Sequence, residues 1–153
     1  MSDPQQRVEV DLRAAMKAGD KERLGTLRML LAEIKNERIR RGGEVDDAGL
    51  AALVRRAVKQ RHESAEQYRK GGREESAARE EREAVILGEY LPEQAGEDEV
   101  RAAVERLVDE RGLSGPAAIG PVMKEMLARF GSRADGATIN RVARQVLAER
   151  AGA

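Results

Sequence analysis

The sequence contains no cysteine, and it has only one histidine among its 153 residues. Without thiols the chain can form no disulfide and no thiolate metal site, and it can use no cysteine nucleophile. His62 has no second imidazole to join it in a zinc site, so we interpret it as a surface residue rather than a ligand or a base. The sequence therefore predicts no metal site and no resident cofactor.

Aromatic residues are also scarce, at 2% of the chain, and tryptophan is missing. The core must then be built from aliphatic side chains, and such a core beside so much Glu and Arg favours helices over sheet. Too few aromatic rings remain for a platform that stacks single-stranded bases. We therefore expect an all-helical protein that does not read single-stranded nucleic acid by stacking.

Long apolar runs are missing as well. No stretch approaches the roughly 20 apolar residues that a membrane-spanning helix needs. The amino terminus lacks the basic start and the apolar run of a signal peptide. From these absences we predict a cytoplasmic protein with no membrane partner.

The motifs of common catalytic sites are absent. The chain has no phosphate-binding glycine loop followed by Lys-Ser or Lys-Thr, no dinucleotide fingerprint and no Gly-x-Ser-x-Gly elbow. Glutamates are plentiful at 74–75 and 80–83, but they are mixed with arginines there, and we interpret them as a solvated helix face. We predict no catalytic residue.

Apolar residues recur at spacings of three and four along most of the chain, and no alternating strand pattern of useful length is present. Capping and breaking residues bound seven predicted helices, at 3–19, 20–42, 46–70, 73–91, 97–112, 121–130 and 136–149. Arg61 falls on the buried side of the third helix. We predict an all-α fold with an amino-terminal domain of about four helices at 1–92, a linker at 93–96 and a smaller three-helix domain at 97–153.

A short polar segment from Gly131 to Gly136 joins the last two predicted helices. Gly131 is placed to end the first of them in the left-handed conformation that only glycine takes without steric cost, and Asp135 is placed to cap the second. Capping and turn geometry are sufficient to explain Gly131, Asp135 and Gly136. Arg133 has no apolar neighbour to pack on, so we expect the joint to present it to a partner.

The formal net charge is zero, but charge is spread unevenly along the chain. Residues 113–153 have six basic and three acidic side chains, a net charge of +3, whereas the net charge is −7 over residues 73–112 and +4 over residues 1–72. The whole chain is therefore no polycation that would coat nucleic acid, and any such contact must be local. The basic tail permits a contact with an RNA backbone without requiring one.

Several motifs, spaced over nearly the whole chain, together resemble the YqeY proteins. They are Lys59-Gln60-Arg61-His62-Glu63-Ser64 with Tyr68, Gly71-Gly72-Arg73, Glu83 with Ile86-Leu87, Tyr90-Leu91-Pro92 with Gln94, Gly120 with Val122-Met123, and Gly131 to Asn140. The resemblance implies a two-part, all-helical protein whose carboxyl-terminal part is similar to the tail domain of GatB, a component of the glutamine-dependent tRNA amidotransferases. In those enzymes the tail domain recognises tRNA, and the kinase and amidase chemistry lies elsewhere.

The resemblance therefore implies tRNA, or a protein complex that handles tRNA, as the partner. It also implies candidates for the tRNA contact, which are Lys124, Arg129, Arg133, Asn140, Arg141 and Arg144. Contacts from arginine to phosphate would give affinity with little sequence readout. Family membership can carry the label of a carbon–nitrogen ligase with glutamine as amide donor, but this chain lacks the catalytic domains, and we expect no such reaction from it alone.

Two other functions stay open. One is a component of a carbon–nitrogen ligase activity, and the other is a helical protein–protein adaptor. The adaptor is suggested by basic residues on the outer faces of the second predicted helix, namely Arg23, Arg28, Lys35, Arg38, Arg40 and Arg41. A solvated face, with cations favourably placed near a helix carboxyl terminus, explains the same residues. The sequence indicates no oligomeric state.

Overall fold

The computed structural model describes residues 3–152. These residues form seven α-helices and two short 3₁₀ helices, with no strand among them. The prediction of an all-helical chain with four helices followed by three is confirmed. The chain divides into two compact units, a first unit of Met1–Pro92 and a second unit of Glu93–Ala153.

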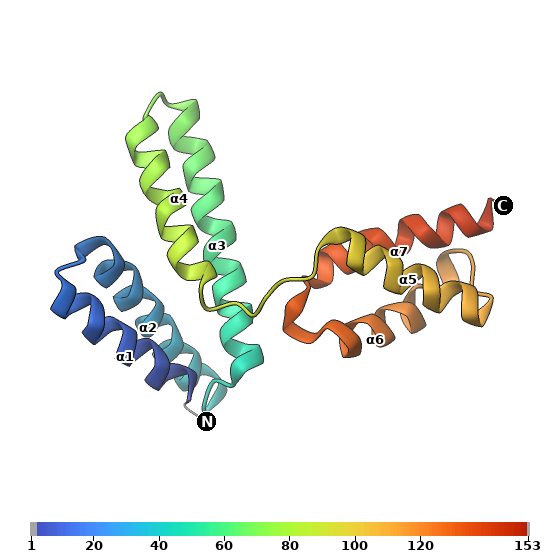
Figure 1. Ribbon diagram of the computed structural model, residues 1–153, viewed down its shortest axis with the longest axis horizontal. Coiled ribbons are helices and arrows are strands. Elements are labelled where there is room, and N and C mark those ends of the chain that lie inside the picture. The colour runs from blue at the N-terminus through green and yellow to red at the C-terminus, as the bar shows by residue number, and fades with distance from the viewer. Residues whose placement is uncertain (1–2, 153) are drawn as a thin grey trace. The chain divides into compact units, whose positions relative to one another are not determined.

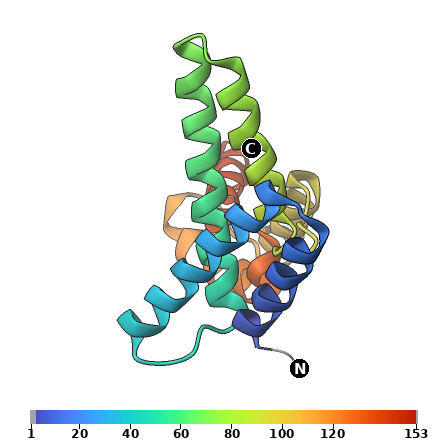
Figure 2. The same ribbon diagram turned by 90° about the vertical axis from the view of Figure 1, so that its left-hand side faces the viewer.

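The first unit is built from two helical hairpins. Its helices are α1 (Pro4–Ala18), α2 (Lys21–Arg41), α3 (Asp47–Lys70) and α4 (Glu74–Gly88). Asp3, Asp20 and Asp46 cap the first three, because each carboxylate accepts a hydrogen bond from a backbone amide of the first turn. α1 lies beside α2 and α3 lies beside α4, and the far end of the α3–α4 hairpin extends beyond α1 and α2 (Figures 1 and 2).

The two hairpins share an almost wholly aliphatic core. It consists of Val8, Ala15, Leu27, Leu30, Ile34, Val45, Leu50, Leu53, Val54, Ala57, Ile86, Leu87 and Tyr90. Removing this apolar surface from water, at roughly 25 cal/mol per Å², is the main force that holds the hairpins together. Met16 and Val85 are 51% and 70% exposed, although Ala15 and Ile86 beside them are buried in this core.

α4 ends at Gly88, three residues before its predicted end at residue 91. The amides of Tyr90 and Leu91 then donate to carbonyls three residues earlier, which is a tighter turn than an α-helix makes. Tyr90 is buried, and its hydroxyl donates to Asp11 Oδ2 at 2.5 Å. Burial and this hydrogen bond raise the pKa of Tyr90 above its ordinary value. A side-chain contact with α1 therefore fixes this end of the helix.

The second unit is a bundle of three helices. These are α5 (Glu97–Arg111), α6 (Ile119–Phe130) and α7 (Gly136–Ala151), with the 3₁₀ helices η1 (Pro116–Ala118) and η2 (Gly131–Arg133) between them. Its core consists of Val100, Ala103, Val104, Leu107, Val108, Val122, Met126, Phe130, Ala134, Ile139, Val142, Ala143, Val146 and Leu147. α7 packs against both α5 and α6, so the α6–α7 joint lies at one end of the bundle.

A half-buried ion cluster links helices of the first unit. Arg61 Nε on α3 lies 3.2 Å from Glu83 Oε2 and 3.7 Å from Glu80 Oε2 on α4, and the three side chains are 17%, 17% and 19% exposed. Arg61 Nη2 also contacts the sulfur of Met29 on α2. The prediction of a solvated face is therefore wrong for Glu80 and Glu83, because Arg61 reaches across from the buried side of α3 and pairs with both.

Replacing Arg61 by Ala should lower the free energy of unfolding of the first unit by about 2 kcal/mol, because two half-buried carboxylates lose the guanidinium that pairs with both of them. Urea denaturation at neutral pH measures this loss. The triple variant Arg61→Met, Glu80→Gln, Glu83→Gln removes the three charges together and should recover at least half of it. An Arg61→Ala protein as stable as the wild type would show that the cluster contributes nothing.

Candidate nucleic-acid interface

The joint between α6 and α7 is shaped by backbone geometry and one cap. Gly131 has φ 54° and ψ −129°, so φ is positive as predicted, but ψ lies outside the left-handed helical region. The difference arises because the chain continues directly into η2. The Asp135 carboxylate accepts a hydrogen bond from the Ala137 amide at 3.1 Å and caps α7. A Cβ on Gly136 would meet Leu127 at the ordinary contact distance of 3.8 Å, so space does not require glycine there.

Arg133 points back onto its own unit. Its Nη2 lies 3.1 Å from Oε2 of Glu99 in the first turn of α5, and its Nε donates to the carbonyl of Glu93 at 3.3 Å. Its own carbonyl accepts a hydrogen bond from the Ala95 amide at 2.8 Å. Arg133, which was expected to be presented to a partner, therefore fastens the segment before α5 to the joint and pairs with a carboxylate of its own unit.

Arg141 is held by the same helix end, because it forms an ion pair with Glu97. Glu97, Asp98 and Glu99 open α5, where negative charge is favoured by the positive end of the helix dipole. Two of the six predicted RNA-contact residues are thus paired with acidic side chains of their own unit.

Three further arginines of the second unit are also paired. Arg101 pairs with Glu105 and Glu149, Arg111 with Glu125, and Arg150 with Glu105 and Asp109. The hydrogen bond from Arg150 lowers the pKa of Asp109 below its usual value. The second unit has nine basic and ten acidic side chains, and five of the nine basic ones are paired with carboxylates of the same unit.

The other three predicted contact residues that carry a charge keep it available. Among the described residues, Lys124, Arg129 and Arg144 have no carboxylate within 4 Å. Arg144 Nε donates to Asn140 Oδ1 at 2.8 Å, which fixes the guanidinium beside α7. Arg129 lines a hollow between α5 and α6, whereas Arg144 lines one between α6 and α7. The structure therefore brings Asn140 and Arg144 together and places Arg129 apart from them.

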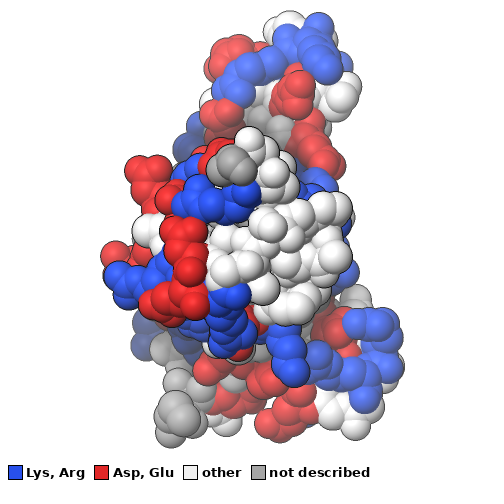
Figure 3. All heavy atoms as spheres, turned by 90° about the vertical axis from the view of Figure 1, so that its right-hand side faces the viewer, with Lys and Arg blue, Asp and Glu red and all other residues white. Residues whose placement is uncertain are grey.

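Arg144 lies at the edge of a hollow of about 240 Å³, which Pro116, Ile119, Leu147 and Ala148 also line. Figure 3 views the end of the second unit where α7 finishes and α5 connects to α6, and uncharged residues gather side by side there. Among residues 3–152, no cluster of three or more histidine or carboxylate side chains is arranged to hold a metal ion. The hollow and Arg144 are therefore suited to binding a ligand through an ion pair and apolar contacts.

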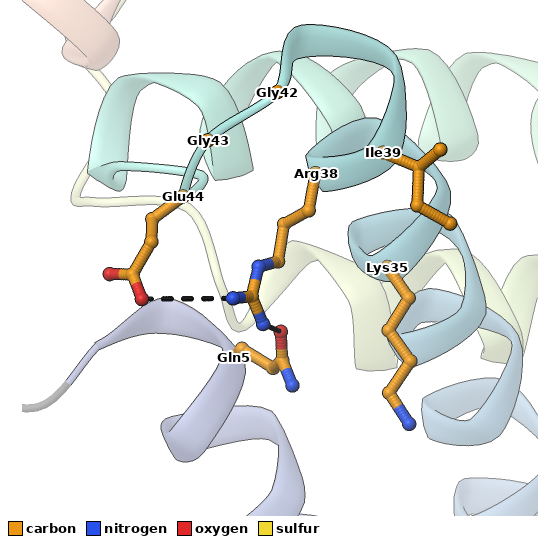
Figure 4. A pocket seen from close by; sticks show the side chains of 7 residues that line it. All are labelled: Gln5, Lys35, Arg38, Ile39, Gly42, Gly43 and Glu44. Atoms are coloured by element: carbon orange, nitrogen blue, oxygen red, sulfur yellow. Dashed lines mark hydrogen bonds and ion pairs between the residues drawn. The ribbon is translucent and has the colours of Figure 1, made fainter.

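The basic outer face of α2 is largely neutralised. Arg38 donates to Gln5 Oε1 at 2.5 Å and lies 3.7 Å from Glu44 Oε1, beside a recess of about 510 Å³ (Figure 4). Arg23 pairs with Glu89, and Arg40 and Arg41 pair with Glu37. Of the basic residues expected there, Arg28 and Lys35 are those without a carboxylate partner in the part of the chain that the structure describes. This face offers an acidic partner little unpaired charge, which weakens the adaptor alternative.

Comparison with known proteins shows similarity over nearly the whole chain. Residues 5–147 match the model of the family described as Yqey-like protein. The "Altered inheritance of mitochondria protein 41, mitochondrial" of Lachancea thermotolerans is 37% identical over 110 residues, which are 70% of this chain and 59% of that protein. The protein of the same name from Pyrenophora tritici-repentis is 29% identical, over 84% of this chain and 71% of that protein. The chain thus spans less than two thirds of the first of these relatives.

These relatives are named as mitochondrial proteins, and by that finding the prediction of a cytoplasmic location is wrong. The prediction rested on the absence of a signal peptide and of a membrane-spanning run. Mitochondrial transit peptides are amphipathic and rich in arginine, so neither absence bears on them. In residues 3–152, no helix has the length and apolar character needed to cross a bilayer.

Replacing Arg133 by Gln should loosen the segment before α5, because the ion pair with Glu99 is lost. The Ala95 amide should then exchange with solvent about tenfold faster, while the free energy of unfolding falls by less than about 1 kcal/mol for this half-exposed pair. Amide exchange followed by NMR measures both. Arg129→Gln removes a cation without a carboxylate partner and should leave the exchange rate of the Ala95 amide unchanged. Equal Ala95 rates in the wild type and both variants would show that Arg133 does not fasten the segment before α5.

Proposed function

Because the chain belongs to the family of YqeY-like proteins, we propose that it is a non-catalytic module that binds tRNA through its second unit. The resemblance of the last three helices to the tail domain of the amidotransferase component GatB supports tRNA as the ligand. In this proposal the chain supplies binding, alone or within a tRNA-handling complex, and amide transfer belongs to other proteins.

The observation that carries the proposal is the division of the six candidate residues. Arg133 and Arg141 are paired with Glu99 and Glu97, so their charge is already satisfied. Lys124 and Arg144 are exposed on α6 and α7, and neither has a carboxylate partner in the described part of the chain. A phosphate could pair with either residue without breaking an existing ion pair.

The location of these cations sets the kind of binding that we expect. Ion pairs with phosphate fix a protein on an RNA backbone but carry little sequence information. Because acidic and basic side chains nearly balance in the second unit, attraction at long range should be weak and contact should depend on the local cations. Binding should therefore be modest, sensitive to salt and tolerant of tRNA sequence.

Arg129 has a secondary place in this account. It lies at the α5–α6 hollow with Arg106, Arg111, Glu110 and Glu125, so acidic side chains share its surroundings. The charge of Arg129 is available. However, Arg144 lines the hollow on another side of α6, so Arg129 would not contact the same phosphate as Arg144. We expect Arg129 to contribute less to tRNA binding than Lys124 and Arg144.

The double variant Lys124→Gln, Arg144→Gln should bind tRNA more weakly and with a shallower salt dependence. Each phosphate contact contributes about −0.9 to the slope of log K against log salt, so the slope should move toward zero by about 1 to 2. Fluorescence titrations of tRNA from roughly 50 to 200 mM salt measure it.

Arg13→Gln with Lys17→Gln, on the exposed face of α1, makes the same change of charge in the first unit and should leave the slope unchanged. Arg133→Gln with Arg141→Gln should have a smaller effect than the Lys124 and Arg144 pair, because those arginines are already paired. A wild-type slope near zero would contradict the proposal. A slope for the Lys124→Gln, Arg144→Gln variant equal to that of the wild type would contradict it as well.

A further inference from the structure

The hollow beside Arg144 has an aliphatic lining and a single charged side chain. Pro116 and Ile119 form one wall, and Leu147 and Ala148 of α7 form the other. Leu147 is 1% exposed and Ala148 is exposed, so the hollow runs from the protein core to the surface. Its volume of about 240 Å³ suits a small apolar group.

The apolar surface continues along α6. Ile119, Met123 and Leu127 are spaced four residues apart and therefore lie on one side of the helix, and Leu127 is 46% exposed. Gly120 is also exposed, and a Cβ built there would meet no atom within 4 Å. Glycine weakens a helix relative to alanine, and no atom of residues 3–152 crowds that position. The surface is therefore open to close approach by another molecule.

Cations border this surface. Arg144 is held beside the hollow by Asn140, and Lys124 is exposed on α6 one residue beyond Met123. Neither has a carboxylate partner among residues 3–152. The surface thus complements a ligand that is apolar in its centre and acidic at its edges.

We propose that the hollow receives an apolar side chain from an acidic amphipathic helix of a partner protein, whose carboxylates pair with Arg144 and Lys124. Laying a helix with such a face into an apolar groove is a common mode of peptide recognition. The lining favours this occupant over a nucleobase, because it has no aromatic ring for stacking and only the Arg144 guanidinium among its side chains to read a base edge. This partner would share Arg144 and Lys124 with tRNA, so the two ligands would compete for these cations, but the hollow itself can be filled without a change of charge.

The test uses the full chain and three acidic helical peptides of about 16 residues, each with one central Leu, Met or Phe between glutamates. At least one peptide should bind and shift the NMR methyl signals of Ile119 and Leu147. Ala148→Leu fills the hollow from the exposed side of α7 and should weaken that peptide about tenfold. Ala102→Leu, on an exposed part of α5, is the matched control and should leave binding unchanged.

The proposal is overturned if none of the peptides shifts the Ile119 and Leu147 methyl signals, or if Ala148→Leu binds them as well as the wild type. It is also overturned if a single-stranded RNA oligonucleotide, and no peptide, shifts those signals, because the hollow would then be a base subsite. Titrating tRNA against Ala148→Leu in parallel separates the two proposals. Loss of peptide binding with unchanged tRNA binding and salt slope supports the hollow as a separate protein site.

Discussion

Ion pairs made by the first turn of α5 determine which cations the second unit offers to a ligand. Glu99 holds Arg133 at the α6–α7 joint, and Glu97 holds Arg141 on α7. Such half-exposed pairs each contribute less than about 1 kcal/mol to stability, but they satisfy the charge of both arginines. Lys124 and Arg144 lie away from that turn and stay unpaired among the described residues, so the proposed functions depend on them.

The helices could be predicted from the sequence because their ends depend on residues within one turn. Asp3, Asp20 and Asp135 each cap a helix through an amide two or three residues later. The end of α4 could not be predicted in this way, because Tyr90 binds Asp11, a residue 79 positions away that is brought close only by packing of the hairpins. The family could also be identified from the spacing of its motifs, and residues 5–147 match that family.

The candidate site was less accessible to sequence reasoning, for one physical reason. A count of charges along the chain treats each side chain as free, whereas Arg133 and Glu99 are 34 residues apart and meet in the folded bundle. Glu83 was misjudged in the first unit for the same reason, since Arg61 reaches it from another helix. The run of three acidic residues at 97–99 was the available signal, but its partners could not be assigned without the fold. The hollow beside Arg144 likewise exists only once η1, α6 and α7 are assembled.

The central claim is that acidic residues of α5 withhold two arginines from RNA. The most direct measurement is the salt dependence of tRNA binding by the double variant Glu97→Gln, Glu99→Gln, which keeps every cation and removes the carboxylates that pair with Arg133 and Arg141. The account predicts tighter binding and a slope of log K against log salt that is steeper by about 1 to 2. A slope and an affinity equal to those of the wild type would contradict it.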